Sequence, residues 1–193
     1  MLFQLPNKNQ KESEPLSHML KAGEVITSQD EYLSRLIDSW EIPRIDAPAH
    51  PAFHFWTTSR FALHDLVIRL LVITGPANVI ISSYSFSAAA ANLISKCADK
   101  HYFISLKLVL NINRATSLQM QRAIHSLPPG IAIAYANIHA KSAVIWNENY
   151  HLSVIFTANA SNSNTIERGI VSTDLETFRF DYNELTRIHT SGA

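Results

Sequence analysis

The chain has 193 residues, of which 47% are hydrophobic and 17% are charged, and its formal net charge is zero. This composition is typical of a folded globular protein and excludes a disordered chain. The length suits one domain with a sizeable core. Zero net charge excludes a strong attraction of the whole chain to nucleic acid or to an anionic membrane.

The sequence contains one cysteine, Cys97, which excludes an internal disulfide and favours a reducing compartment. The longest apolar run, Leu66–Ile73, contains Arg69 and is too short to span a bilayer. The first residues show no apolar stretch followed by a cleavage site. We therefore expect a cytoplasmic protein with no membrane partner.

Residues 1–59 are expected to form an extension packed on the main domain, which comprises residues 60–193. Within the extension, Ser28 and Glu31 have the spacing of a capping box, which predicts a helix through Trp40. A loop is predicted after it by three prolines, Pro43, Pro48 and Pro51.

The main domain alternates between helical and extended patterns. One of Thr57, Thr58 and Ser59 is expected to cap a helix that ends at Gly75. The elements expected after it are a strand over 79–81, a helix over 87–100, a strand over 103–112, a helix from 116 or 117 to 127, strands over 131–135, 139–146, 152–157 and 167–171, and a helix over 175–188. This order predicts an α/β fold in which helices flank a mixed sheet.

His139 and Lys141 stand two residues apart on the strand predicted over 139–146, so both side chains are expected on one face. A neutral imidazole can attack phosphorus, and a lysine can bind phosphate oxygens. Asn159 offers a further phosphate contact, and the Glu167 carboxylate can accept a hydrogen bond from the second ring nitrogen of a histidine. Together these residues predict a phosphodiester-cleaving site that needs no metal.

The half of the chain that carries this pair is basic. Between Ala77 and Asn147 there are six Lys or Arg residues against the single acid Asp99. Such an excess suits an anionic substrate, although an ordinary solvated surface gives the same count, and that alternative stays open.

Cleavage also needs a group that protonates the leaving oxygen. The histidines at 54 and 64 lack a lysine two residues later, so the chain offers no second pair of this kind around them. A two-fold dimer would bring two copies of His139 together, one as nucleophile and one as general acid.

The pair His139-x-Lys141, followed by Asn159 twenty residues after the histidine and then by Glu167, resembles the signature of the phospholipase D superfamily. It is most similar to the single-motif phospholipase-D-like endonucleases, and the likeness extends back through Tyr84-Ser85-Phe86. The resemblance implies a phospholipase-D-like α/β sandwich, metal-independent activity without a cofactor, and a homodimer with one composite site. It implies His139 as nucleophile or acid, Lys141 and Asn159 on the phosphate, and Glu167 orienting a histidine.

Two positions depart from the family pattern. Trp146 stands where the family often has an aspartate, and Phe156 stands where a glycine is usual. The Phe156 ring is expected to narrow the site or to alter its choice of substrate. Thr157 keeps the hydroxyl of the family's serine.

The sequence thus predicts a nuclease that hydrolyses DNA through a phospho-histidine intermediate. Its expected substrate contacts are Arg114, Thr157 and Ser161. Two alternatives stay open: a phospholipase or phosphatidyl transferase, and a catalytically inactive phosphate-binding or protein-interaction module.

Overall fold

The computed structural model describes residues 52–57, 62–161 and 167–192. Among these, the strands are β1 (Ala52–Thr57), β2 (Ala77–Ser83), β3 (Phe103–Asn111), β4 (Ala132–Ala136), β5 (Ser142–Trp146), β6 (His151–Phe156) and β7 (Glu167–Ser172). The helices are α2 (Leu63–Thr74), α3 (Ala88–Asp99), α4 (Ile112–Ala115), α5 (Leu118–His125) and α6 (Leu175–Ser191). The helix predicted over 28–40 and the proline loop after it lie outside the described residues.

The described strands form one mixed sheet in the order β1-β7-β6-β5-β2-β3-β4. Strands β2, β3 and β4 run parallel, because the connections between them contain helices. Strand β5 lies antiparallel to β2, and β6, β7 and β1 then alternate in direction. The sheet therefore has a parallel half and an antiparallel half, which meet at β5.

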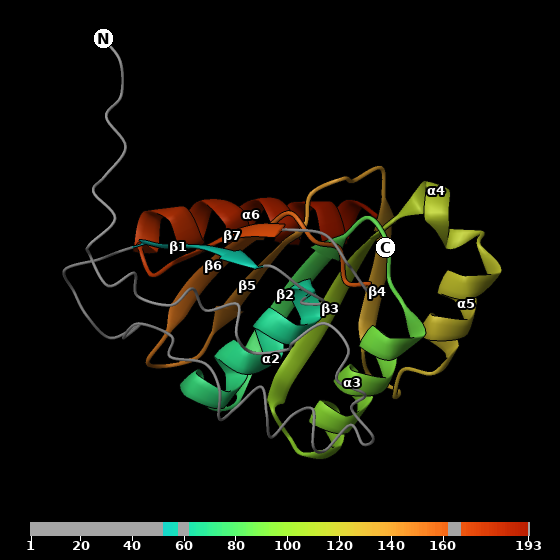
Figure 1. The fold of residues 1–193 in the computed structure, drawn as a ribbon, viewed down its shortest axis with the longest axis horizontal. Helices are drawn as coiled ribbons and strands as arrows, with labels where there is room; N and C mark the ends of the chain where they lie inside the picture. The colour runs from blue at the N-terminus through green and yellow to red at the C-terminus, as the bar shows by residue number, and fades with distance from the viewer. Residues whose placement is uncertain (1–51, 58–61, 162–166, 193) are drawn as a thin grey trace, which may run out of the picture.

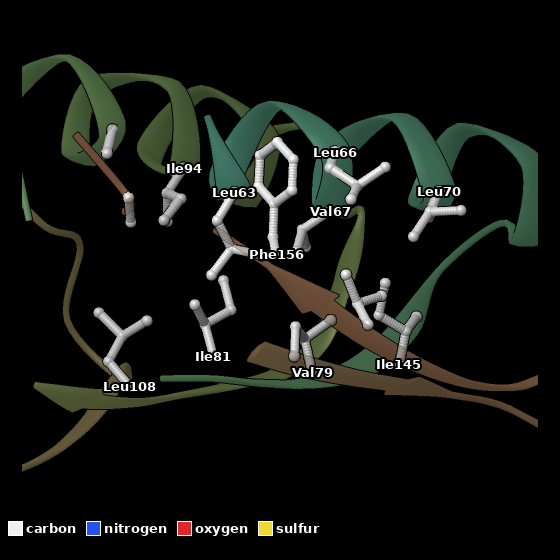
Figure 2. Close-up of a cluster of buried hydrophobic side chains, with 14 of the residues drawn as sticks. Leu63, Leu66, Val67, Leu70, Val79, Ile81, Ile94, Leu108, Ile145 and Phe156 are labelled. Atoms are coloured by element: carbon white, nitrogen blue, oxygen red, sulfur yellow. The ribbon is translucent and has the colours of Figure 1, made fainter. Parts of the chain in front are cut away.

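Helices cover both faces of this sheet, as Figure 1 shows, with α6 along one face and α2 and α3 on the other. The larger core lies under α2, where Leu63, Leu66 and Leu70 face the sheet residues Val79 and Ile145 (Figure 2). The face under α6 has its own cluster of buried hydrophobic side chains, which includes Phe178 and Leu185 of the helix. These layers confirm the predicted α/β fold with a mixed sheet flanked by helices.

Strand β1 was not predicted, because the prolines before it and the threonines and serine after it indicate a loop and a helix cap. It is the outermost strand of the sheet and pairs antiparallel with β7, with Phe55 opposite Gly169. The predicted cap at Thr57 is wrong, since this residue ends the strand, and positions 58 and 59 lie outside the described residues. Helix α2 instead begins at Leu63, and the Ala62 N–H donates to Asp65 Oδ2 at 2.8 Å.

The remaining boundaries differ from the prediction by a few residues. Strand β2 is longer than predicted, and the predicted strand over 103–112 ends one residue earlier, because residues 112–115 form the short helix α4. Strand β5 begins at Ser142 rather than at His139. Helix α6 continues to Ser191, beyond the predicted end at 188.

Phe156 lies in the core and not at the site, so the expectation that its ring narrows the site is wrong. The side chain is 2% exposed and contacts the Phe55 ring, with the ring centroids 5.6 Å apart. Gly169 provides the space for both rings: a Cβ there would overlap the Phe55 ring and lie 2.8 Å from Phe156 Cδ2. Trp146, the other departure, packs against Phe178 and Tyr182 of α6.

The substitution Gly169→Ala should lower the free energy of unfolding by about 1–3 kcal/mol, because the added methyl group overpacks a filled core. Urea denaturation followed by circular dichroism measures this loss. The double variant Gly169→Ala with Phe55→Leu is the control, since the shorter leucine leaves room for the methyl group. If the losses of the two single variants simply add in the double variant, the rings are not what makes the glycine necessary.

Candidate active site

The strand directions bring the predicted site residues to one edge of the sheet. The C-terminal ends of β2, β3 and β6 lie at the same edge as the N-terminal ends of β5 and β7. The connections at this edge contain Tyr84, Arg114, His139, Lys141, Thr157, Asn159 and Ser161, and Glu167 is the first residue of β7.

His139 and Lys141 lie in the connection from β4 to β5, not on the strand that was predicted to hold them. Lys141 is the residue next to the strand, and its carbonyl accepts a hydrogen bond from the Phe156 N–H at 2.8 Å. The two side chains nonetheless lie together: Lys141 Nζ is 3.1 Å from His139 Nδ1. The imidazole is exposed, so a substrate can reach it.

The hydrogen bond between these side chains determines where the imidazole proton lies. A charged lysine ammonium has only donors, so His139 Nδ1 must accept this bond. The neutral imidazole therefore carries its proton on Nε2. The ring also contacts Tyr84, with the ring centroids 4.7 Å apart and the planes tilted by 48°.

Asn111 fixes the segment that carries the histidine. This side chain is 2% exposed, and its Nδ2 donates to the Ile138 carbonyl at 2.6 Å. Its Oδ1 accepts from the Asn113 N–H at 2.9 Å, so the amide links α4 to the residue before His139. Sequence reasoning missed Asn111; the available signal was a polar residue at the end of a buried strand, where an asparagine also caps a helix.

Serine hydroxyls join the other segments at this edge. Ser82 Oγ lies 2.8 Å from Ser142 Oγ, between the end of β2 and the start of β5. Ser83 Oγ accepts from the Ala160 N–H at 2.9 Å. Ser161, predicted as a substrate contact, has its Oγ 2.9 Å from Ser85 Oγ, and its role toward a substrate stays a prediction.

Asn159 follows β6, and its backbone carbonyl accepts a hydrogen bond from the Leu63 N–H at the start of α2, at 3.3 Å. Its Oδ1 is buried and has no hydrogen-bond partner among the described residues. A buried polar atom without a partner costs free energy. Because an amide oxygen only accepts hydrogen bonds, a contact of Asn159 with phosphate would use its Nδ2 donor instead, and that contact stays a prediction.

Thr157 and Glu167 are paired with each other across β6 and β7. Thr157 Oγ1 donates to Glu167 Oε2 at 2.5 Å and accepts from the Arg168 N–H at 2.8 Å. The predicted hydrogen bond from a histidine to Glu167, and the predicted contact of Thr157 with substrate, both stay predictions.

Arg114 lies on α4, beside the Tyr84 ring, with its Cζ 5.4 Å from the ring centroid. The ring of Tyr84 therefore contacts both the His139 imidazole and the Arg114 guanidinium. Sequence reasoning named Tyr84 only as part of a family pattern, because no spacing rule connects residue 84 with residues 114 and 139.

Within the ranges 52–57, 62–161 and 167–192, no group of three or more His, Cys, Asp or Glu side chains is placed to hold a metal ion. None of the helices in these ranges is long and apolar enough to cross a membrane.

No protein-family model and no curated protein sequence matches the chain. Two solved structures resemble it. NucT from Helicobacter pylori is 16% identical, with a TM-score of 0.51, over 71% of this chain and 95% of NucT. Nuc from Salmonella typhimurium, a phospholipase D family member, is 15% identical, with a TM-score of 0.53, over 74% of this chain and 97% of Nuc.

The fold is that of the phospholipase D family. The phospholipase D fold was the expectation drawn from the His139-x-Lys141 signature, and the structure confirms it. The likeness extends over nearly the whole length of both solved chains and over 71% and 74% of this chain.

The substitution Asn111→Ala should lower the free energy of unfolding by about 1–3 kcal/mol, because it leaves the buried Ile138 carbonyl without its donor. Urea denaturation measures the loss, and amide hydrogen exchange should become faster in residues 137–141. Asn113→Ala is the matched control, since its side-chain bond to Asn137 is exposed and its removal should change stability by less than about 0.5 kcal/mol. Equal losses in the two variants would contradict the role given to Asn111.

Proposed function

We propose that the protein is a phosphodiesterase, and specifically a nuclease that hydrolyses DNA through a phospho-histidine intermediate. The observation that carries the proposal is the contact of Lys141 Nζ with His139 Nδ1 at 3.1 Å, at an exposed edge of a phospholipase D fold. The basic composition of residues 77–147 supports an anionic substrate. The proposal includes a cytoplasmic location, which the free, buried thiol of Cys97 supports.

In the first step, an imidazole nitrogen of His139 attacks the phosphorus. The new P–N bond forms as the bond from phosphorus to the leaving oxygen breaks. That oxygen takes a proton from a second histidine, which acts as general acid. Lys141 and Asn159 bind the non-bridging oxygens, where negative charge develops.

In the second step, water attacks the phosphorus of the phospho-histidine and the P–N bond breaks. The second histidine, now neutral, accepts a proton from the water. The products are a phosphomonoester and an alcohol, and both histidines return to their starting protonation states. The chemistry draws on the imidazoles and the lysine, and the proposal is therefore for activity without a metal.

The Lys141 ammonium can donate a hydrogen bond either to His139 Nδ1 or to a bound phosphate. Substrate binding therefore has a role in activating His139. In the free protein the ammonium donates to His139 Nδ1, so the ring proton lies on Nε2. A bound phosphate attracts the ammonium, which releases Nδ1. With Nδ1 released, the ring exchanges its proton with solvent, losing it from Nε2 and gaining one at Nδ1. The Nδ1–H then donates a hydrogen bond to a carboxylate such as Glu167, and Nε2 keeps the lone pair that attacks.

The second histidine is proposed to be His139 of another copy of the chain. Among the described residues, the hydrogen bond of the His139 ring is to Lys141 and not to a second histidine. A two-fold axis through this edge of the sheet would place two copies of His139 at one phosphate.

The substitution His139→Ala should abolish hydrolysis of DNA and of bis(p-nitrophenyl) phosphate, by a factor of at least about 10³, because it removes the nucleophile. Both assays are run with EDTA present, and wild-type activity should persist there. His151→Ala is the matched control, since His151 contacts Phe178 rather than the site and its loss should leave the rate nearly unchanged. Full activity in the His139 variant would disprove the proposal, and cleavage of phospholipid vesicles but not of DNA would favour a phospholipase.

The composite site is tested by refolding mixtures of wild-type and His139→Ala chains. If each site needs His139 from both copies, a mixture with equal amounts should retain about one quarter of the wild-type activity, because only dimers of two wild-type chains are active. Independent sites would retain about one half. A linear dependence of activity on the wild-type fraction would rule out the shared site while leaving the nuclease proposal in place.

A further inference from the structure

Arg114 and Tyr84 form a second basic feature beside the His139–Lys141 pair. The Tyr84 ring contacts the His139 imidazole, with the ring centroids 4.7 Å apart. The Arg114 guanidinium carbon lies 5.4 Å from the centroid of the same Tyr84 ring. A cation near a tyrosine ring is attracted to its π electrons. One aromatic ring thus separates the guanidinium from the imidazole.

The backbone beneath Arg114 is held in place relative to the histidine. Helix α4 follows β3 directly, and the Asn111 side chain links its first turn to the Ile138 carbonyl. Asn113 adds a hydrogen bond from its Nδ2 to Asn137 Oδ1 at 3.3 Å. Because these bonds connect α4 to the residues just before His139, the backbone that carries Arg114 is held beside the backbone that carries His139.

The Arg114 guanidinium is exposed, and no carboxylate pairs with it in the part of the chain that the structure describes. The sequence has no Asp or Glu between Lys100 and Asn147, so no acid on α4, α5 or the segment before β5 competes for it. A guanidinium with free donors binds phosphate oxygens in a two-pronged geometry.

We propose that Arg114, supported by the Tyr84 ring, binds the phosphate next to the one that is cleaved. This inference rests on the proposed function, in which His139 and Lys141 take the scissile phosphate. A substrate with several phosphates in a chain, such as a polynucleotide, satisfies both positions at once. A phospholipid or an isolated phosphodiester offers one diester phosphate and leaves Arg114 unused.

Thymidine trinucleotides test this directly, because they contain two internucleotide phosphates. In two analogues, one phosphate or the other is replaced by a neutral methylphosphonate, so that the remaining diester alone can be cleaved. For the wild-type protein, kcat/KM for at least one analogue should fall about tenfold relative to the same bond in the unmodified trinucleotide, which is the loss of one charged contact.

In Arg114→Gln, the methylphosphonate should make little further difference, because the contact that it removes is already absent. Arg122→Gln, which removes an exposed arginine from α5, should keep the tenfold effect. Tyr84→Leu should lose the effect and Tyr84→Phe should keep it, since only the ring is needed beneath the guanidinium. Circular dichroism spectra check that each variant is folded.

An equal methylphosphonate effect in wild type and Arg114→Gln, or no effect in wild type, would overturn the inference while the nuclease proposal stands. Failure of the proposed function gives a different result: the wild-type protein cleaves no trinucleotide, or His139→Ala cleaves it at the wild-type rate. That result would overturn the second phosphate site together with the function on which it rests.

Discussion

The arrangement at this edge of the sheet depends on where β5 lies and which way it runs. It pairs with β2 on one side and with β6 on the other, antiparallel to both. Its first residue therefore begins where β2 and β6 end, and the side chains just before it meet the loops that follow those strands. A parallel β5 would place His139 and Lys141 at the opposite edge, away from Tyr84 and Asn159. The direction of one short strand thus decides whether a site forms.

Buried polar contacts then hold the loops at that edge. Asn111 connects the end of β3 to the residue before His139, and serine hydroxyls connect the end of β2 to β5 and to the residues after β6. Each contact satisfies a backbone or hydroxyl group that would otherwise be buried without a partner. His139 itself is exposed, while the Asn159 Oδ1 is one of several buried polar atoms without a partner among the described residues. The hydrogen bonds at Ile138 and Ser142 hold the backbone directly before and after the His139–Lys141 pair.

The order of helices and strands in the described domain was predictable from apolar spacing, because strands and helices must bury one face. Strand β1 was not, since prolines and hydroxyl residues around a short aromatic segment indicate a loop as readily as an edge strand. The role of Phe156 was also misjudged. A ring at a position where relatives have glycine suggests a narrowed site, but Gly169 on the neighbouring strand leaves space for that ring in the core. The sequence alone does not show that a glycine on one strand leaves space for a ring on the next, because this depends on which residues of the two strands pair.

The sequence by itself determined the α/β class, the phospholipase D fold and the pair His139 and Lys141, because spacing along one segment is a local property. Only the tertiary structure decided which other residues join them. Tyr84, Asn111 and Arg114 come from three separate segments, and their contacts depend on strand order, direction and register rather than on separation in sequence. The structure likewise placed the pair before β5 rather than on it, since the hydrogen-bonded ladder ends where the neighbouring strands end.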